Sequence, residues 1–167
     1  NLTGRTGCGL CGASTLKQAI RQPPPVRSVV QITAEQLNNA LAELSDKQTL
    51  NKLTGAIHAA AWVDVERGIT DVREDVGRHN ALDKLLGVLC RTGKNVNAGF
   101  VIVTSRASYE MVQKTAFSGI GLLVAISAPT GLAIRLAEQA GITLVGFARG
   151  DKHVIYTHPQ RILHYEN

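Results

Sequence analysis

The sequence predicts one α/β domain in which helices cover both faces of a largely parallel β-sheet. From Gly55 onward, short apolar runs alternate with amphipathic segments of about ten residues, and crossover helices of this kind join parallel strands and cover the sheet. The chain has 167 residues, of which 44% are hydrophobic and 19% are charged. This length and composition suffice for a single buried core. We therefore expect a three-layer α/β/α architecture.

The first predicted helix spans residues 34–44, because the residues around its start carry a capping signal. Thr33 and Gln36 have the spacing of a capping box, in which each side chain accepts a hydrogen bond from the backbone N–H of the other residue. Ile32 and Leu37 have the spacing of a hydrophobic staple across the helix start. The expected buried face consists of Leu37, Ala40, Leu41 and Leu44.

The segments after Gly55 alternate between strand and helix patterns. Residues 56–65 and 69–75 flank the turn-like sequence Glu66-Arg67-Gly68, which predicts a β-hairpin. Helical spacing of apolar residues and continuous apolar runs predict the remaining elements. In chain order they are a helix at 77–90, a strand at 98–105, a helix at 108–117, a strand at 122–127, a helix at 130–141, and strands at 143–148 and 153–158.

Residues 1–25 differ in composition from the rest and are predicted to precede the folded domain, which we place at residues 26–167. The stretch RTGCGLCG sets Cys8 and Cys11 among glycines, which predicts a flexible loop. The stretch QPPP at 22–25 predicts a stiff, extended connector, because proline fixes its own backbone and keeps the preceding residue out of a helix.

Polar residues follow several of the predicted strands at the point where each strand ends. Ligands of open α/β sheets bind at the carboxyl ends of the strands, where helix N-termini present free amide groups. Small hydroxyl residues, glycines and cations at these ends suit a ligand that carries phosphates. The candidate binding residues are Ser105 and Arg106, Ser127 and Thr130, and the run Phe147, Ala148, Arg149, Gly150, Asp151 and Lys152.

These candidates also have a structural interpretation. The serines and Thr130, and likewise Ser108, could cap the helices that follow them, and the two cations of the last run could lie in a solvated loop. His58 lies in an apolar strand, where a hydrogen-bonded core histidine is expected. Four charged or titratable residues also lie close together between the predicted hairpin and the next helix. A strand-to-helix turn does not need so many, which favours a functional role. They are Glu74, Asp75, Arg78 and His79.

The composition argues against several classes of function. The formal net charge is +5, but the basic residues are scattered and only 4% of residues are aromatic, so we expect no nucleic-acid partner. No apolar run has the length of a membrane span, and the first residues do not read as a signal peptide. An odd number of cysteines, three, without a secretion signal favours a reducing compartment, and we expect a cytoplasmic protein.

The Cys-x-x-Cys pair is compatible with three kinds of chemistry. A structural zinc site needs four ligands, and Cys90 is expected to pack in the core together with Met111 and Phe117, so no metal site is expected within one chain. A site shared across a dimer stays open. A redox pair normally follows a strand and opens a helix, which is not the setting of Cys8. A cysteine on a mobile tether could instead take sulfur from a donor persulfide and pass it to a second acceptor.

Several longer motifs together resemble the FdhD/NarQ family of formate dehydrogenase accessory sulfurtransferases. In chain order they are RTGCGLCG, IHAAAW, EDVGRHNALDKLLG, SRASYEMVQK, SAPTGLA, and LVGF followed by YTHPQR. They extend from Arg5 to Arg161, so the resemblance covers most of the chain.

The resemblance implies a sulfur carrier that accepts persulfide sulfur from a cysteine desulfurase and transfers it to the molybdenum cofactor before that cofactor enters formate dehydrogenase. The cofactor would be bound as a substrate, in its bis-molybdopterin guanine dinucleotide form, and GDP or GTP could mimic it. By the family pattern, Cys8 carries the persulfide, Cys11 is the second cysteine of the motif, and residues 147–152 bind the cofactor. The family also implies a cytidine deaminase-like core and a homodimer. It further implies a segment of substantial length ahead of the cysteine loop, whereas this sequence begins almost at that loop.

Two other functions stay open. The protein could be a non-covalent chaperone of the molybdenum cofactor, in which the cysteines only shape a lid. A zinc deaminase would need the motifs H-x-E and P-C-x-x-C. His58 is followed by two alanines, and the cysteine pair lacks the proline, so the deaminase is the weaker alternative.

Overall fold

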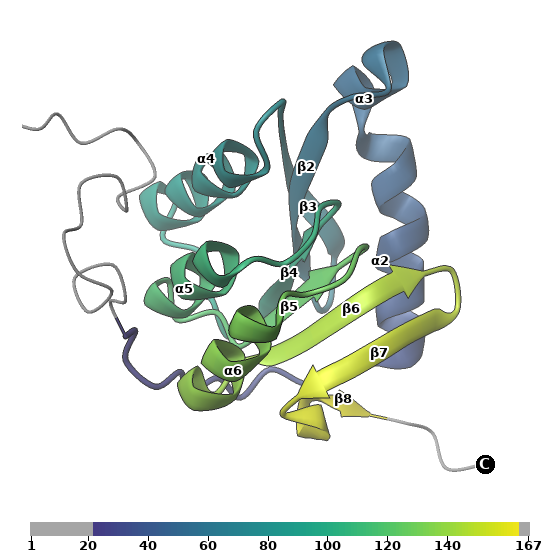
Figure 1. The fold of residues 1–167 in the computed structure, drawn as a ribbon. Helices are drawn as coiled ribbons and strands as arrows, with labels where there is room; N and C mark the ends of the chain where they lie inside the picture. Colours follow the sequence, from purple (N-terminus) through teal and green to yellow (C-terminus); the bar gives the residue numbers. More distant parts are fainter. Residues whose placement is uncertain (1–21, 164–167) are drawn as a thin grey trace, which may run out of the picture.

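A six-stranded sheet in the order β3-β2-β4-β5-β6-β7 forms the middle layer of the molecule (Figure 1). The computed structural model describes residues 22–163. The strands of this sheet are β2 (His58–Asp64), β3 (Gly68–Asp75), β4 (Gly99–Val103), β5 (Leu122–Ala125), β6 (Thr143–Arg149) and β7 (Lys152–Thr157), and a second, two-stranded sheet joins β1 (Ile32–Thr33) to β8 (Ile162–Leu163). The helices are α2 (Ala34–Lys47), α3 (Thr49–Thr54), α4 (Arg78–Arg91), α5 (Tyr109–Phe117) and α6 (Gly131–Ala140), with a 3-10 turn η1 (Pro159–Arg161). None of the helices within 22–163 has the length and apolar character needed to cross a membrane.

The three central strands β4, β5 and β6 run parallel, and the outer pairings are antiparallel. The helix α5 connects β4 to β5, and α6 connects β5 to β6, as the crossover pattern predicted. β2 and β3 form the predicted hairpin. β7 returns antiparallel to β6 because a connection as short as residues 150–151 forms a hairpin. The α/β class is confirmed, with parallel pairing at the centre of the sheet; α3, β1, β8 and η1 were not predicted.

Helices cover both faces of the sheet, which gives the predicted three layers. The helices α4, α5 and α6 lie on one face, and α2 covers the other (Figure 1). The side chains of β4 alternate between the two interfaces, as strand geometry requires. Val101 and Val103 belong to the core under α4–α6, whereas Phe100 and Ile102 belong to the core under α2. None of the four is more than 1% exposed, so β4 is buried on both faces.

The start of α2 matches the prediction in detail. The backbone N–H of Gln36 donates to Thr33 Oγ1 at 3.1 Å, and the backbone N–H of Thr33 donates to Gln36 Oε1 at 2.8 Å. Both hydrogen bonds of the capping box are therefore present. The four predicted face residues are buried, and the helix continues beyond the predicted end to Lys47.

The structure corrects the expectation that Cys90 and Phe117 pack in the core. Met111 is fully buried, but Cys90 is exposed and Phe117 is 52% exposed. Cys90 directly follows Leu89, the last buried residue of α4, and one residue turns the side chain by about 100° around a helix, away from the buried stripe. Both residues line a groove of about 410 Å³ at the ends of α4 and α5.

The surroundings of Gly99 and Gly87 predict opposite effects of replacing each glycine by alanine. At Gly99 a Cβ would lie 2.1 Å from the carbonyl oxygen of Val63 and 2.7 Å from the ring of Trp62, whereas at Gly87 in α4 nothing lies within 4 Å. We expect Gly99→Ala to lower the free energy of unfolding by about 1–3 kcal/mol or more, as overpacking does. Gly87→Ala should raise it by about 0.5–1 kcal/mol, because alanine favours a helix. Urea unfolding followed by circular dichroism measures both, and equal effects would contradict the close packing of β4 against β2.

Candidate functional site

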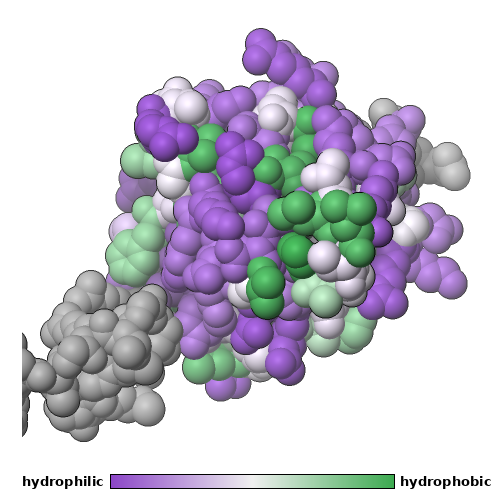
Figure 2. Space-filling view, turned by 90° about the horizontal axis from the view of Figure 1, so that it is seen from above, coloured by the Kyte–Doolittle hydropathy of each residue, from purple (hydrophilic) through white to green (hydrophobic). Residues whose placement is uncertain are grey.

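The topology brings the carboxyl ends of β4, β5 and β6 together at one edge of the sheet, named here the carboxyl edge. Because β2 runs antiparallel to β4, and β3 antiparallel to β2, the start of β2 and the end of β3 lie at this edge as well. The helices α4, α5 and α6 begin there (Figure 1). From above, the molecule shows a largely hydrophilic surface with a patch of hydrophobic residues (Figure 2). This is the kind of edge at which α/β proteins bind ligands.

Backbone hydrogen bonds join the loops of the carboxyl edge to one another. The N–H of Thr130, after β5, donates to the carbonyl of Ala107, after β4, at 3.0 Å. The N–H of Phe147 on β6 donates to the carbonyl of Ser127 at 3.3 Å. These bonds hold the candidate loops in one relative arrangement, as a preformed binding site requires.

Four of the predicted binding residues at this edge divide between structural and accessible positions. They are Ser105, Arg106, Ser127 and Thr130. Thr130 caps α6, because its Oγ1 accepts a hydrogen bond from the N–H of Ala133 at 3.2 Å. Ser105 is only 4% exposed and donates to the carbonyl of Arg106 at 3.2 Å. Ser127 is half-buried, and Arg106 is exposed. Arg106 and Ser127 are therefore the better placed of these four to meet a ligand.

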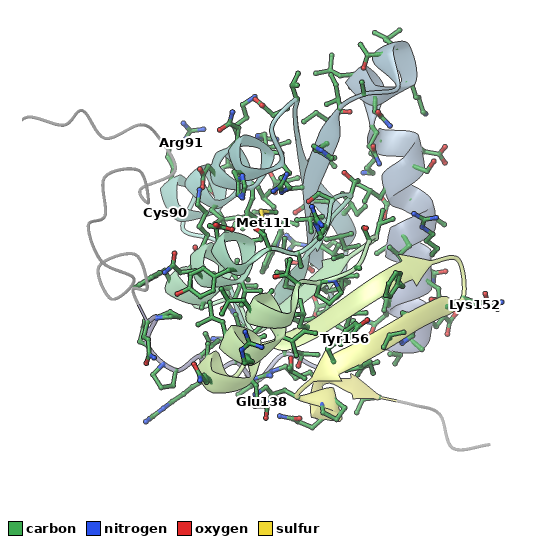
Figure 3. All side chains as sticks on the ribbon, viewed as in Figure 1. Cys90, Arg91, Met111, Glu138, Lys152 and Tyr156 are labelled. Carbon is green, nitrogen blue, oxygen red and sulfur yellow. The ribbon has the colours of Figure 1, made fainter. Side chains whose placement is uncertain are left out.

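The predicted segment 147–152 forms the tip of the β6–β7 hairpin. Phe147 has a φ of 52°, a conformation that bulky residues rarely adopt, and its side chain is 50% exposed. Ala148 is fully buried in the core under α2, so its side chain is not available to a ligand. The four remaining residues are exposed, and Lys152 projects at the hairpin end in Figure 3. They are Arg149, Gly150, Asp151 and Lys152.

Two members of the dense charged group, Glu74 and Asp75, have structural roles. The carboxylate of Glu74 accepts hydrogen bonds from the N–H groups of Leu50 and Asn51, at 2.9 and 3.0 Å, and so caps α3. Asp75 accepts hydrogen bonds from Lys84, at 2.5 Å, and from the N–H of Gly77. These bonds, that of Lys84 above all, lower the pKa of Asp75 to about 2. The functional interpretation is thus left to the other two members, Arg78 and His79.

A cluster of four side chains lies between the starts of α4 and α5; we refer to Arg78, His79, Ser108 and Glu110 as the α4/α5 cluster. His79 Nε2 lies 3.4 Å from Ser108 Oγ and 3.8 Å from Glu110 Oε2. Ser108 also forms a side-chain hydrogen bond with Glu110, and it makes no capping bond to α5 although it occupies the capping position. The side chains of His79 and Glu110 are 35% and 29% exposed. Both are therefore within reach of a bound molecule.

The charges within the α4/α5 cluster favour a neutral histidine beside an ionised carboxylate. Burial lowers the pKa of His79, and the positive charge of Arg78 lowers it further, while Glu110 opposes the shift. Burial by itself raises the pKa of Glu110. Hydrogen bonds from Ser108 and from the backbone amide of Glu110 lower this pKa, and so do the charges of His79 and Arg78. Together they outweigh burial, so the pKa of Glu110 lies below its ordinary value. At neutral pH the cluster therefore holds a neutral imidazole, a carboxylate and a guanidinium.

Sequence reasoning did not single out Glu110. The one local signal is a serine at the start of a predicted helix with a glutamate two residues later, which is also an ordinary helix start. His79, whose imidazole contacts both Ser108 and Glu110, lies 29 positions before Ser108 in the sequence, so no local pattern connects them.

The predicted sulfur-carrying residues Cys8 and Cys11 lie outside the described range 22–163, and their role stays a prediction. Within that range, no group of three or more His, Cys, Asp or Glu side chains is arranged to hold a metal ion. The third cysteine, Cys90, lies with Arg91 at the far end of α4 from the carboxyl edge (Figure 3).

The fold and this edge define a class of protein: an α/β domain that presents polar and charged side chains at the carboxyl ends of central parallel strands. The chain belongs to the FdhD/NarQ family, whose model matches residues 1–163.

Curated relatives and a solved structure agree with this assignment. The sulfur carrier protein FdhD of Cupriavidus necator is 56% identical over 164 residues, which are 98% of this chain and 57% of the relative. The protein of the same name from Xanthomonas euvesicatoria is 54% identical, over 97% of this chain and 58% of its own length. The chain thus spans less than two thirds of these relatives. A structure of a putative formate dehydrogenase accessory protein from Desulfotalea psychrophila is similar with a TM-score of 0.79 and 29% identity, covering 86% of this chain and 61% of that one.

The arrangement of the α4/α5 cluster predicts the response of His79 to its neighbour. The negative charge of Glu110 favours the protonated imidazole, so Glu110→Gln should move the pKa of His79 still further below its ordinary value. NMR titration of the imidazole resonances measures this pKa. Glu138→Gln is the matched control, because its carboxylate lies 3.8 Å from His158 instead. A higher pKa of His79 in the Glu110 variant would show that the two side chains are not paired as described.

Proposed function

We propose that this chain is the sulfur-carrying part of a sulfurtransferase that delivers sulfur to the molybdenum cofactor of formate dehydrogenase. One observation carries the proposal: a curated relative that bears the name sulfur carrier protein aligns over 164 residues of this 167-residue chain, a range that has to include Cys8 and Cys11. The similar solved structure bears the name of a formate dehydrogenase accessory protein, which supports the recipient.

The proposed chemistry at Cys8 is thiol–persulfide exchange. The Cys8 thiolate attacks the outer sulfur of the donor's persulfide; the donor's S–S bond breaks, the donor leaves as a thiolate, and Cys8 becomes a persulfide. An acceptor with a free electron pair then attacks the outer sulfur of this persulfide. The second S–S bond breaks and Cys8 returns to the thiolate, so the cycle consumes neither an oxidant nor a reductant. Cys11 is proposed as a helper that either tunes the Cys8 thiolate or resolves mixed disulfides.

The carboxyl edge is the proposed site for the acceptor, the bis-molybdopterin guanine dinucleotide form of the cofactor. Arg106, Arg149 and Lys152 are exposed there, and none of them forms an ion pair with a residue in 22–163. Such cations suit the phosphates of a dinucleotide, and GDP or GTP is the corresponding soluble probe. The half-buried Ser127 adds a hydroxyl to the same edge.

The proposed partners follow from the same scheme. A cysteine desulfurase supplies the persulfide, formate dehydrogenase receives the cofactor, and two copies of the chain form a homodimer in the cytoplasm.

Cys8→Ala tests the covalent step. Wild-type protein incubated with a cysteine desulfurase and cysteine should gain the mass of one sulfur atom at Cys8, and dithiothreitol should remove it, because a persulfide is reducible. The Cys8 variant should gain none, and formate dehydrogenase activity in cells that carry only this variant should fall to background. Mass spectrometry of the peptide and a formate oxidation assay measure the two effects.

Cys90→Ala is the control for this experiment, because Cys90 is an exposed thiol that could take up sulfur non-specifically. It should keep both the persulfide and the enzyme activity. Normal formate dehydrogenase activity with Cys8→Ala would reject covalent transfer and favour the non-covalent chaperone.

A further inference from the structure

The groove of about 410 Å³ between the ends of α4 and α5 is open and mostly apolar; we refer to it as the Cys90 groove. Its walls include Leu86, Val96, Phe117 and Ile120. The ring of Phe117 is 52% exposed, and the Cys90 thiol beside it is exposed as well. Apolar walls of this kind gain free energy when another apolar surface takes them out of water.

The described part of the chain begins close to the Cys90 groove. The helices α4, α5 and α6 all begin at the carboxyl edge, so they end together at the opposite side, with α5 between the other two (Figure 1). The backbone N–H of Val26 donates to the carbonyl of Ala140 at the end of α6, at 2.8 Å, and the chain stays packed on the domain as far back as Pro23, which is buried. Packed helices are about 8–10 Å apart, whereas the six residues from Val26 back to Ile20 can span about 20 Å. Ile20 is therefore within reach of the groove.

The sequence TLKQAIR at residues 15–21 has the composition that such a groove accepts. Leu16, Ala19 and Ile20 have the spacing of one side of a helix, and the first four letters have the spacing of a capping box. The two charged residues of this stretch are basic, and residues 1–22 contain no Asp or Glu. Basic groups suit the place where α4, α5 and α6 end, because the last carbonyls of a helix carry partial negative charge.

We propose that residues 15–21 dock in the Cys90 groove of the same chain. Leu16 and Ile20 lie against the ring of Phe117 and cover it together with the Cys90 thiol. A second copy of the chain is the poorer occupant, because a stable interface takes about 20–30 residues on each side and nine residues line this groove. A segment of the same chain needs no such area, because its connection to the domain keeps its effective concentration at the groove high.

Docking limits the reach of the sulfur-carrying residue, a consequence that rests on the proposed function. Cys8 lies 15 positions before Pro23, which corresponds to about 50 Å of fully extended chain, but only eight positions before Leu16, or about 27 Å. The groove and the carboxyl edge are separated by the length of α4, about 20 Å for its 14 residues. Docking therefore holds Cys8 nearer the groove, and release of the segment extends its range toward the acceptor.

Alkylation of Cys90 tests the docking from the side of the segment. In the full chain with Cys8→Ala and Cys11→Ala, Cys90 is the remaining thiol of the three, and its rate of reaction with iodoacetamide is followed by mass spectrometry. Adding Leu16→Ser and Ile20→Ser should raise this rate at least about fivefold, because the two serines remove most of the apolar burial that holds the segment in the groove.

Trypsin cleavage tests the docking from the side of the groove. Trypsin cuts after Lys17 and Arg21, which docking protects. Phe117→Ser removes the exposed ring from the groove and should make both cleavages about fivefold faster or more. The matched controls are Val29→Ser for the alkylation and Leu132→Ser for the cleavage. Val29 is a connector residue that is 79% exposed, and Leu132 is a 44% exposed leucine at the start of α6, so neither should change the measured rate.

The outcomes separate the docking from the proposed function. An unchanged alkylation rate in the double serine variant, or unchanged cleavage in folded Phe117→Ser, would overturn the docking and leave the persulfide on Cys8, which is measured separately, standing. Protection of Cys90 that grows with protein concentration would also overturn it, since a second copy of the chain would then cover the groove. If Phe117→Ser does not fold, the alkylation of Cys90 still decides, because the double serine variant changes no residue within 22–163.

Discussion

The burial of β4 on both faces is the constraint on which the rest of the structure depends. A strand whose side chains are all apolar and inaccessible needs a packing partner on each side, so α2 on one face and α4–α6 on the other are both required. Such a strand has no room for a charged or catalytic side chain along its length. Polar side chains are therefore confined to the strand ends, and the parallel direction of β4, β5 and β6 places three of these ends at the same edge.

The carboxyl edge combines rigidity with two separate groups of charged side chains. Backbone bonds from Thr130 to Ala107 and from Phe147 to Ser127 join neighbouring loops, so the groups on these loops do not have to be ordered when a ligand arrives. Arg149 and Lys152 lie with Asp151 at the hairpin end, whereas the α4/α5 cluster holds a carboxylate, a guanidinium and a neutral imidazole. The two ends of the edge therefore present different sets of charged groups.

The charged residues in the turn between β3 and α4 divide into two pairs with different partners. Glu74 and Asp75 stabilise the fold, because one carboxylate caps α3 and the other binds Lys84 and the backbone of its own turn. These bonds fix the place where α4 begins. Arg78 and His79, in the first turn of that helix, are thereby directed to the start of α5, where they meet Ser108 and Glu110. The charges that stabilise the turn and those that belong to the α4/α5 cluster are thus neighbours in sequence but differ in their partners.

The sequence by itself determined the features that depend on residues close together in the chain. The capping box of Thr33 and Gln36, the buried face of α2 and the β2–β3 hairpin follow from spacings of a few residues, and the alternation of apolar strands with helices is enough to predict a layered α/β fold. Only the tertiary structure decided that Cys90 and Phe117 face solvent, that Ala148 is buried within a segment otherwise open to a ligand, and that Glu110 meets His79. The physical reason is that periodicity and capping act within one or two helical turns. Which side chains face each other across α4, α5 and the hairpin depends instead on how whole elements pack, and that information is spread over the entire chain.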